Sequence, residues 1–335
     1  MFKYYGASYV VTAICLAIGY WLGGLPGLAI TFVLGVLETS LSFDNAIVNA
    51  SVLKHWDERW RQYFLRYGLP IAVFGMRFVF PLAIVSIAVG VNPIEAFNLA
   101  TGHPEQYEQI MKSVHHEVAA FGGVFLLMVF LQFFFDHEKD VHWVHSLETI
   151  MSKMGAWKFT SYVIAAVIVV GISYLVPAIE QAAVLYSGFA GLATFACVKA
   201  LGTWTGGDDT GSKIIKQGIM GLMYLELVDA SFSFDGVIAA FALTNNIFIM
   251  TAGLMIGAMF VRSMTLHLVD KGTLAEFRYL EHSAFWAIGV LAACMFTSLA
   301  VHVPEVITGL TGAGLIGIGI WTSIRAKKYE EANNV

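Results

Sequence analysis

Charged residues are scarce in this chain of 335 residues. Asp, Glu, Lys and Arg together make up 13% of it, whereas the hydrophobic fraction is 58% and the mean hydropathy is +0.71. A soluble domain carries about 25% charged residues, so this chain lacks the polar surface that such a domain requires. We therefore expect an all-α polytopic membrane protein with the lipid bilayer, and not nucleic acid, as a partner.

Cysteine is also rare. Cys15, Cys197 and Cys294 each lie in an apolar stretch and show no paired spacing, which argues against disulfides and cysteine metal ligands. The chain has no Walker motif, no dinucleotide fingerprint and no Ser-His-Asp arrangement, so we expect no enzymatic activity. The first apolar stretch has no small-residue cleavage site, and we expect it to be a membrane span and not a signal peptide.

Long hydrophobic runs, by contrast, are frequent. Ten of them are long enough to cross about 30 Å of hydrocarbon. They cover residues 6–24, 26–53, 68–91, 114–135, 158–178, 181–201, 214–243, 246–268, 282–302 and 304–324. The sixth is the weakest of the ten because of Lys199 and its many small residues, so nine spans are the alternative.

The basic residues fall on one side of this ten-span topology. Sixteen of the 19 Lys and Arg residues lie at the N-terminus, in alternate loops or in the tail. Only Lys112 lies on the opposite side, while Arg77 and Arg262 lie within spans. Because cytoplasmic loops are enriched in Lys and Arg, we expect both termini in the cytoplasm and the chain in a bacterial inner (plasma) membrane.

An acidic motif occurs twice inside the apolar runs. Residues 38–47 read Glu-Thr-Ser-Leu-Ser-Phe-Asp-Asn-Ala-Ile, and residues 229–238 read Asp-Ala-Ser-Phe-Ser-Phe-Asp-Gly-Val-Ile, at a constant offset of 191 positions. The copies fall on the second and seventh spans, so they run in opposite directions. The pattern predicts two inverted repeats with a midplane site on interrupted motif helices. The expected divisions are a single transmembrane domain 1–335, its halves 1–178 and 179–324, and a cytoplasmic tail 325–335.

Carboxylates inside a membrane are costly and usually functional. Glu38 and Asp44 are six positions apart, about 9 Å along a straight helix, so one such helix does not chelate one ion with both. Either each helix unwinds at its motif or one ion takes ligands from both copies, and the inverted repeat favours the second arrangement. Carboxylate, amide and hydroxyl oxygens suit the hard divalent cations Mg²⁺, Ca²⁺ and Mn²⁺.

Both motifs resemble signatures of a known family. Glu38-x-x-Leu41-x-x-Asp44-Asn45 resembles the N-terminal signature of the TerC family of integral membrane proteins, and Glu226-x-x-Asp229-x-x-Phe232-x-x-Asp235 resembles its C-terminal signature. TerC-like proteins are associated with manganese export and tellurite resistance, and their superfamily includes LysE-type exporters. Gly236 stands where that family usually has a small polar ligand, and the long His-bearing loops indicate a divergent branch. The resemblance implies that the ion site is lined by Glu38, Asp44, Asn45, Glu226, Asp229 and Asp235.

Other polar residues are expected to support this site. The serines share helix faces with the acids, the arginines would balance part of the acidic charge, and the histidines occupy matching positions on the fourth and ninth spans. These supporting residues are Ser40, Ser42, Ser231, Ser233, Arg77, Arg262, His116 and His282.

We expect a secondary transporter that exports a divalent cation, with Mn²⁺ first and Mg²⁺ or Ca²⁺ as alternatives. A second copy of the chain is a further candidate partner. The alternative is a non-transporting membrane assembly or scaffold factor that works with the secretion machinery. A third candidate is an intramembrane hydrolase using His116, Glu117 and the acids, although the sequence has neither an HExxH helix nor an evident nucleophile. The ion, its coupling, the oligomeric state and the role of the His-bearing loop 136–157 stay open.

Overall fold

The computed structural model describes residues 2–68, 71–136, 141–157, 159–204, 218–301 and 303–332. Within these ranges the undescribed side chains are those of Phe2, Leu65, Arg66, Ala72, Val73, Thr203, Trp204, Phe234, Asp235, Ala275 and Glu305. The described chain is mainly helical and contains no strand, which confirms the expected all-α class. The helices from the N-terminus to the middle of the chain are α1 (Phe2–Leu41), α2 (Phe43–Leu53), α3 (Glu58–Tyr63), the π-helices η1 (Phe64–Gly68) and η2 (Ile71–Val79), α4 (Phe80–Val89), α5 (Pro93–Gly102), α6 (Pro104–Ser113) and α7 (His115–Phe134). Those that follow are α8 (His145–Met154), α9 (Thr160–Ser173), α10 (Gln181–Trp204), α11 (Ile219–Ala240), α12 (Ile247–Lys271), α13 (Thr273–Glu276), α14 (Leu280–Ser298) and α15 (Glu305–Ala332).

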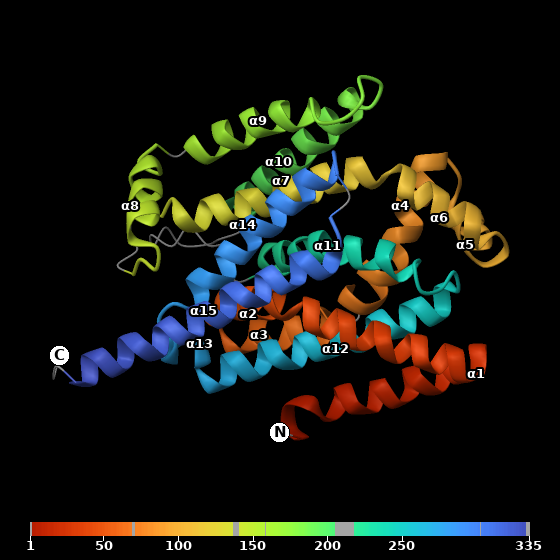
Figure 1. Ribbon diagram of the computed structural model, residues 1–335, viewed down its shortest axis with the longest axis horizontal. Helices are drawn as coiled ribbons and strands as arrows, with labels where there is room; N and C mark the ends of the chain where they lie inside the picture. Colours follow the sequence, from red (N-terminus) through yellow and green to blue (C-terminus); the bar gives the residue numbers. More distant parts are fainter. Residues whose placement is uncertain are drawn as a thin grey trace.

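Helix α1 is a hairpin of two antiparallel halves (Figure 1). The chain reverses at Gly24, whose φ of 60° and ψ of −148° suit glycine alone, and Pro26 follows. A β-carbon at Gly19 would lie 2.3 Å from Oγ1 of Thr31, although a straight helix would separate these residues by about 18 Å. The reversal coincides with the predicted boundary between the first two apolar stretches.

All ten predicted apolar stretches are mainly helical. Among the described residues, six helices are long and apolar enough to cross a membrane, counting the α1 hairpin once. A seventh is added if Phe74–Val89 and Pro93–Gly102, which meet at 104°, form one bent span. The count of ten and the division into inverted halves at residue 178 stay predictions.

The burial of these helices indicates a membrane environment. Helices α7 and α12 are central, with 72% of their apolar windows buried, whereas the corresponding share is 17% for α1 and 22% for α15. The outer helices therefore present large apolar side chains, such as Trp21 at 83% exposure. A continuous apolar exterior of this kind is stable against lipid and not against water.

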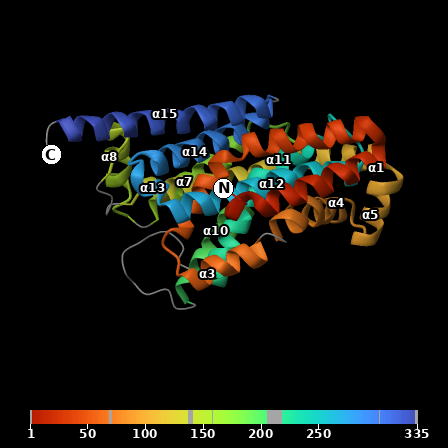
Figure 2. The ribbon, with the colours of Figure 1, turned by 90° about the horizontal axis from the view of Figure 1, so that it is seen from below.

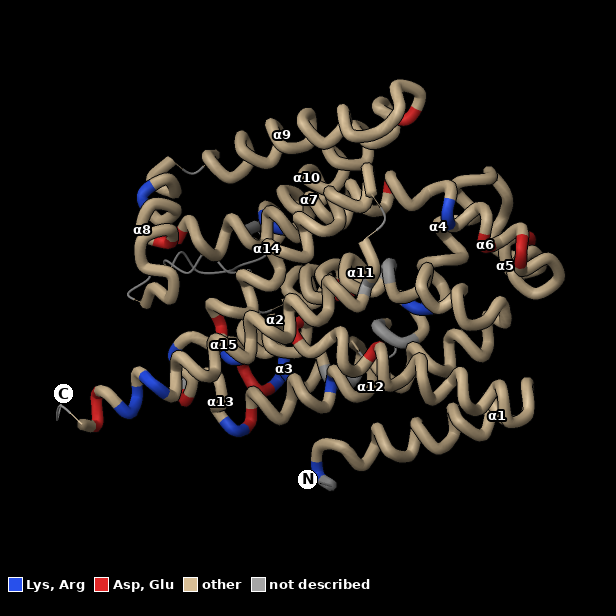
Figure 3. The backbone as a smooth tube through the Cα atoms, in the orientation of Figure 1, with Lys and Arg blue, Asp and Glu red and all other residues tan. Residues whose placement is uncertain are grey.

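Charged residues gather at the two ends of the helix bundle (Figure 3). One end carries α3, α8, α13 and the last turns of α15, and the basic side chains concentrate there; the opposite end carries α5 and α6 with mainly acidic ones (Figure 3). The N-terminus reaches the first end through Lys3, whose Nζ lies 3.7 Å from Oδ2 of Asp270. The C-terminal helix reaches it through Arg278, which donates to Glu330 over 2.9 Å. Both termini therefore lie at the same end, as the charge pattern predicts.

The two motif helices differ in continuity. The first bends at Ser42, between α1 and α2, where φ is −100° and ψ is 20°. Backbone hydrogen bonds nevertheless continue across the bend, from Ser42 N to Glu38 O and from Ala46 N to Ser42 O. Helix α11 runs unbroken through the second motif. The expected interruption is therefore wrong for the second copy, and the marked irregularity lies instead in η1 and η2, between α3 and α4 in the sequence. Figure 2 shows α3 below the main bundle, whereas η2 packs against α11 and α12.

Candidate functional site

Arg77 joins the two acidic motifs. It lies on η2 and is 2% exposed. Its Nη2 donates to Oε1 of Glu38 over 2.6 Å, and its Nη1 donates to Oδ2 of Asp229 over 3.3 Å. One guanidinium therefore bridges the acid that opens the first motif and the acid that opens the second. The predicted role of Arg77 as a counter-charge agrees with these contacts.

A second contact also links the motifs. Asn45 Nδ2 donates to Oδ1 of Asp229 over 2.6 Å. Ser42 Oγ lies 3.4 Å from Oε1 of Glu38, one turn away on the same helix face. The face shared by Glu38, Ser42 and Asn45 therefore packs against the second copy, in agreement with the helical spacing in the sequence.

Two glycines make room for Glu38. A β-carbon at Gly257 of α12 would lie 2.1 Å from the Glu38 Cγ, and one at Gly236 of α11 would lie 3.0 Å from its Oε2. A side chain at Gly257 would overlap Glu38, because real β-carbons do not approach so closely. Gly236, the departure from the TerC-like signature, thus accommodates a carboxylate from the first copy.

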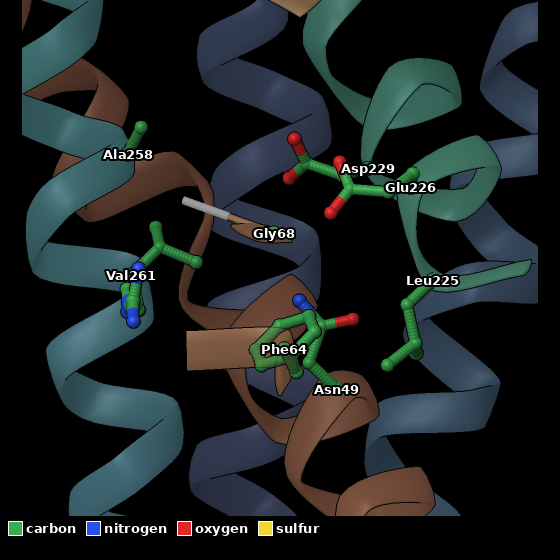
Figure 4. A pocket seen from close by; sticks show the side chains of 9 residues that line it. Asn49, Phe64, Gly68, Leu225, Glu226, Asp229, Ala258 and Val261 are labelled. Carbon is green, nitrogen blue, oxygen red and sulfur yellow. The ribbon is translucent and has the colours of Figure 1, made fainter. Parts of the chain in front are cut away.

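A small cavity lies beside Asp229. It has a volume of about 30 Å³, enough for one or two waters or a partly hydrated ion. In Figure 4 the carboxylates of Glu226 and Asp229 project from α11 toward this space, close to Gly68. The lining residues are Asn49, Phe64, Gly68, Leu225, Glu226, Asp229, Ala258, Val261 and Arg262.

Several polar atoms around this cavity lack a hydrogen-bond partner within the described part of the chain. They are Oδ1 of Asn49, Oε2 of Glu226 and Nη1 of Arg262. Asn49 and Glu226 are 5% and 7% exposed, so bulk water does not satisfy them. Buried polar atoms are normally paired, and two unpaired oxygens beside the Asp229 carboxylate provide acceptors for a cation.

Asp44 does not line this cavity. It is buried at the start of α2, where its Oδ1 accepts from the Asn45 backbone N–H over 2.9 Å. A β-carbon at Gly312 would lie 3.1 Å from its Oδ2, so the carboxylate faces α15. The sequence groups Asp44 with Glu38 as ligands, but the two carboxylates project toward different helices.

The serines predicted to support the site also differ in their surroundings. Ser40 is exposed and donates to Val36 O of its own helix, so it does not support the site. Ser231 donates to Leu227 O and packs toward Gly122 of α7. Ser233 is buried and its Oγ has no partner among the described groups. The side chain of Asp235 lies outside the described residues.

The two predicted histidines lie outside the cavity lining. His116, at the start of α7, contacts Glu180 through Nδ1. His282, on α14, makes a 2.8 Å contact from Nε2 to Val141 O and lies 3.7 Å from Glu148. Their matching sequence positions therefore correspond to ion-pair and loop contacts at the ends of α7 and α14.

The predicted ligands do not converge on one metal centre. No group of three or more His, Cys, Asp or Glu side chains in the described ranges is arranged to hold a metal ion. Glu38 and Asp229 are instead connected through Arg77, Asn45 donates directly to Asp229, and Glu226 and Asp229 share the cavity. Sequence reasoning missed Asn49, although its position four residues after Asn45 places it on the same helix face.

Comparisons with known proteins correct the family assignment. The sequence model of the DUF475 family, described as "Protein of unknown function", matches residues 43–330. DUF475 is a different family from TerC, so the TerC resemblance is wrong. The choice of Mn²⁺ over Mg²⁺ or Ca²⁺ and the direction of export depended on that resemblance.

A bacterial membrane protein shares a short region with the chain. The "Uncharacterized membrane protein YceF" of Bacillus subtilis (strain 168) is 36% identical over 74 residues. The match covers 21% of this chain and spans about a quarter, 27%, of the length of YceF. No solved structure gives a significant match. Together with the apolar helices, the relative indicates a multi-pass membrane protein.

Proposed function

The chain is a multi-pass membrane protein of the DUF475 family, and we propose that it transports a hard divalent cation through the cavity between its acidic motifs. The observation that carries this proposal is the pair of unpartnered oxygens, on Asn49 and Glu226, beside the Asp229 carboxylate. Carboxylates within a membrane mark ion pathways more often than they serve packing alone.

The donor set favours a hard ion. Asn49, Glu226 and Asp229 offer amide and carboxylate oxygens, and none of the described lining residues carries sulfur or imidazole. Oxygen ligands of this kind suit Mg²⁺, Ca²⁺ and Mn²⁺, whereas Cu⁺ and Zn²⁺ prefer thiolate or imidazole. A volume of about 30 Å³ requires the ion to lose most of its hydration shell, and the two carboxylates replace part of it.

Reciprocal contacts support an inverted repeat around this site. Glu38 faces Gly236, and Asp229 contacts Asn45. Because Asp229 and Gly236 lie 191 positions after Glu38 and Asn45, each contact is the counterpart of the other. Reciprocity of this kind is the signature of a two-fold relation, and transporters with inverted repeats place their sites at the repeat interface.

Arg77 has a defined part in the proposed transport cycle. Its guanidinium occupies the space between Glu38 and Asp229. A divalent ion that binds Glu38 and Asp229 would compete with Arg77, which contacts Oε1 of Glu38 and Oδ2 of Asp229. The arginine therefore acts as a built-in counter-ion that keeps the motif helices together until an ion replaces it.

The proposal is tested by ion flux into proteoliposomes containing the purified chain. Mn²⁺, Mg²⁺, Ca²⁺ and Zn²⁺ are supplied in turn, and we expect flux of at least one hard ion with little Zn²⁺ flux. Asp229→Asn should reduce that flux at least tenfold, while Ser40→Ala, at an exposed position away from the site, should leave it within twofold of wild type. Absence of flux for all four ions would refute the proposal and favour the assembly factor.

A further inference from the structure

A second and much larger cavity lies on the other side of Glu226. It has a volume of about 1120 Å³, opens to the outside of the helix bundle and is lined by residues of α10, α11, α3 and the two π-helices. Helix α11 lines it with residues spaced three and four apart, including Met223 and Glu226. Apart from Glu226 and Thr194, the described lining is apolar or aromatic, and none of its side chains is Lys or Arg.

The exposure of the lining side chains falls from the open rim of the cavity to its inner wall, where Glu226 lies. Tyr67 and Met223 are 52% and 45% exposed at the rim, whereas Glu226 is 7% exposed. Oε2 of Glu226 has no hydrogen-bond partner among the described groups. No described residue of the chamber lining is basic, and Arg262, which interacts electrostatically with Glu226, lines the small cavity and not this chamber, so the carboxylate favours a positive group on the chamber side.

Aromatic rings cluster at the same cavity. The Trp60 and Tyr63 rings meet edge to face with centroids 5.2 Å apart, and Tyr63 and Tyr67 lie 5.9 Å apart. All three line the chamber. Aromatic faces attract organic cations through the ring quadrupole, and they accommodate the apolar substituents of such cations at the same time.

We propose that this chamber binds a lipophilic organic cation of the quaternary ammonium or phosphonium class. The positive centre lies against Glu226, and the apolar substituents contact the aromatic cluster and the adaptable side chains of Met76 and Met223. The volume accommodates a drug-sized ligand. The proposed ligand of this chamber belongs to a different chemical class from the proposed transported metal ion, although Glu226 lines both cavities.

Charge complementarity distinguishes this occupant from a lipid tail. A hydrocarbon chain would fill the apolar walls but would leave Oε2 of Glu226 without a partner, which is unfavourable. A lipophilic anion of the same size would be repelled. A lipophilic cation combines apolar contact with the walls and electrostatic attraction to the carboxylate.

Two ions of nearly the same shape and opposite charge provide the test. Binding of tetraphenylphosphonium and tetraphenylborate to the purified chain in detergent is measured by titration calorimetry. We expect tetraphenylphosphonium to bind at least tenfold more tightly, and Glu226→Gln to remove most of that preference. Equal affinity for the two ions, or an unchanged preference in Glu226→Gln, would overturn the proposal.

Two further variants keep the test independent of folding and of metal transport. Met223→Lys places a positive charge one turn from Glu226 at the exposed rim, and it should reverse the preference toward tetraphenylborate. Asp229→Asn, in the small cavity only, should leave tetraphenylphosphonium affinity within twofold while it reduces metal flux. Charge-selective binding without metal flux in wild type would refute the transport proposal alone, and flux without charge-selective binding would refute this one alone.

Discussion

Asn45 donates its side-chain N–H to the Asp229 carboxylate over 2.6 Å, and this bond joins α2 to α11 across 184 positions of sequence. The other oxygen of the same carboxylate accepts from Arg77 of η2. Asp229 is thus the point at which three helices meet in the protein interior. Changes at this junction should affect stability and ion binding together, whereas changes at Asp44 or Ser40 should not.

Removal of the Arg77 charge should destabilise the protein. Arg77→Gln leaves Glu38 and Asp229 buried without their bridging cation, and breaking a buried ion pair typically costs about 3–5 kcal/mol. The apparent melting temperature in detergent should fall markedly. The double variant Glu38→Gln/Arg77→Gln should lose less than the two single changes together, since both charges are then removed. Additive losses would contradict the proposed pairing.

A methyl group at Gly257 should displace Glu38. The new β-carbon would lie 2.1 Å from the Glu38 Cγ, and overpacking of this kind costs about 1–3 kcal/mol. Gly257→Ala should therefore lower both the melting temperature and the ion flux. Gly314→Ala is the matched control, because no atom lies within 4 Å of its new β-carbon. Equal melting temperatures for the two variants would show that Glu38 does not occupy this position.

Neutralisation of Asp44 should have little effect on ion binding. Its carboxylate faces Gly312 of α15 and does not line the small cavity. In calorimetric titrations with the ion that shows flux, Asp44→Asn should bind within threefold of wild type. Asp229→Asn should bind at least tenfold more weakly, because it removes a charged oxygen of the cavity wall. An equal loss of ion affinity in both variants would show that Asp44 is also a ligand of the ion.

The reversal of α1 should depend on Gly24. Its backbone lies in a region that only glycine adopts readily, and a side chain there costs about 1–3 kcal/mol. Gly24→Ala should destabilise the protein in thermal denaturation. Gly6→Ala, on the same hairpin with no atom near its new β-carbon, should have no such effect or a slight stabilising one. If the two variants melt alike, the hairpin does not turn at Gly24.

Reporter fusions should place the two termini on one side of the membrane. Lys3 and Asp270 are in contact, as are Arg278 and Glu330, so both ends of the chain meet the loop around α13. Fluorescent or phosphatase reporters at the N-terminus and after Ala332 should therefore give the same sidedness. A reporter inserted beside Lys112 should give the opposite one. Opposite sidedness of the termini would require an odd number of spans.

Much of the architecture was predictable from the sequence because hydrophobic runs determine membrane helices locally. The reversal at Gly24 and Pro26 follows from residues that interrupt a helix, and the meeting of the two motif copies follows from their repetition. These features depend on short-range chemistry or on symmetry, both of which a sequence displays.

The contacts of individual side chains were less predictable because they depend on how each helix is rotated against its neighbours. Asp44 and Glu38 belong to one motif, yet the bend at Ser42 and the packing of α15 direct them to different partners. The π-helical path around Arg77 is likewise a product of tertiary packing. The family assignment failed because acids at short spacings within apolar helices are not restricted to one family.

Glu38 fits between two helices only because Gly236 and Gly257 lack side chains. The effect of a substitution at any one of these three positions therefore depends on the residues at the other two. A shorter acid at position 38 would relax the requirement for glycine at the other two, and a larger residue at either glycine would become tolerable only after such a change. Directed evolution that starts from a Gly257 variant should consequently recover activity through substitutions at position 38 before any other site.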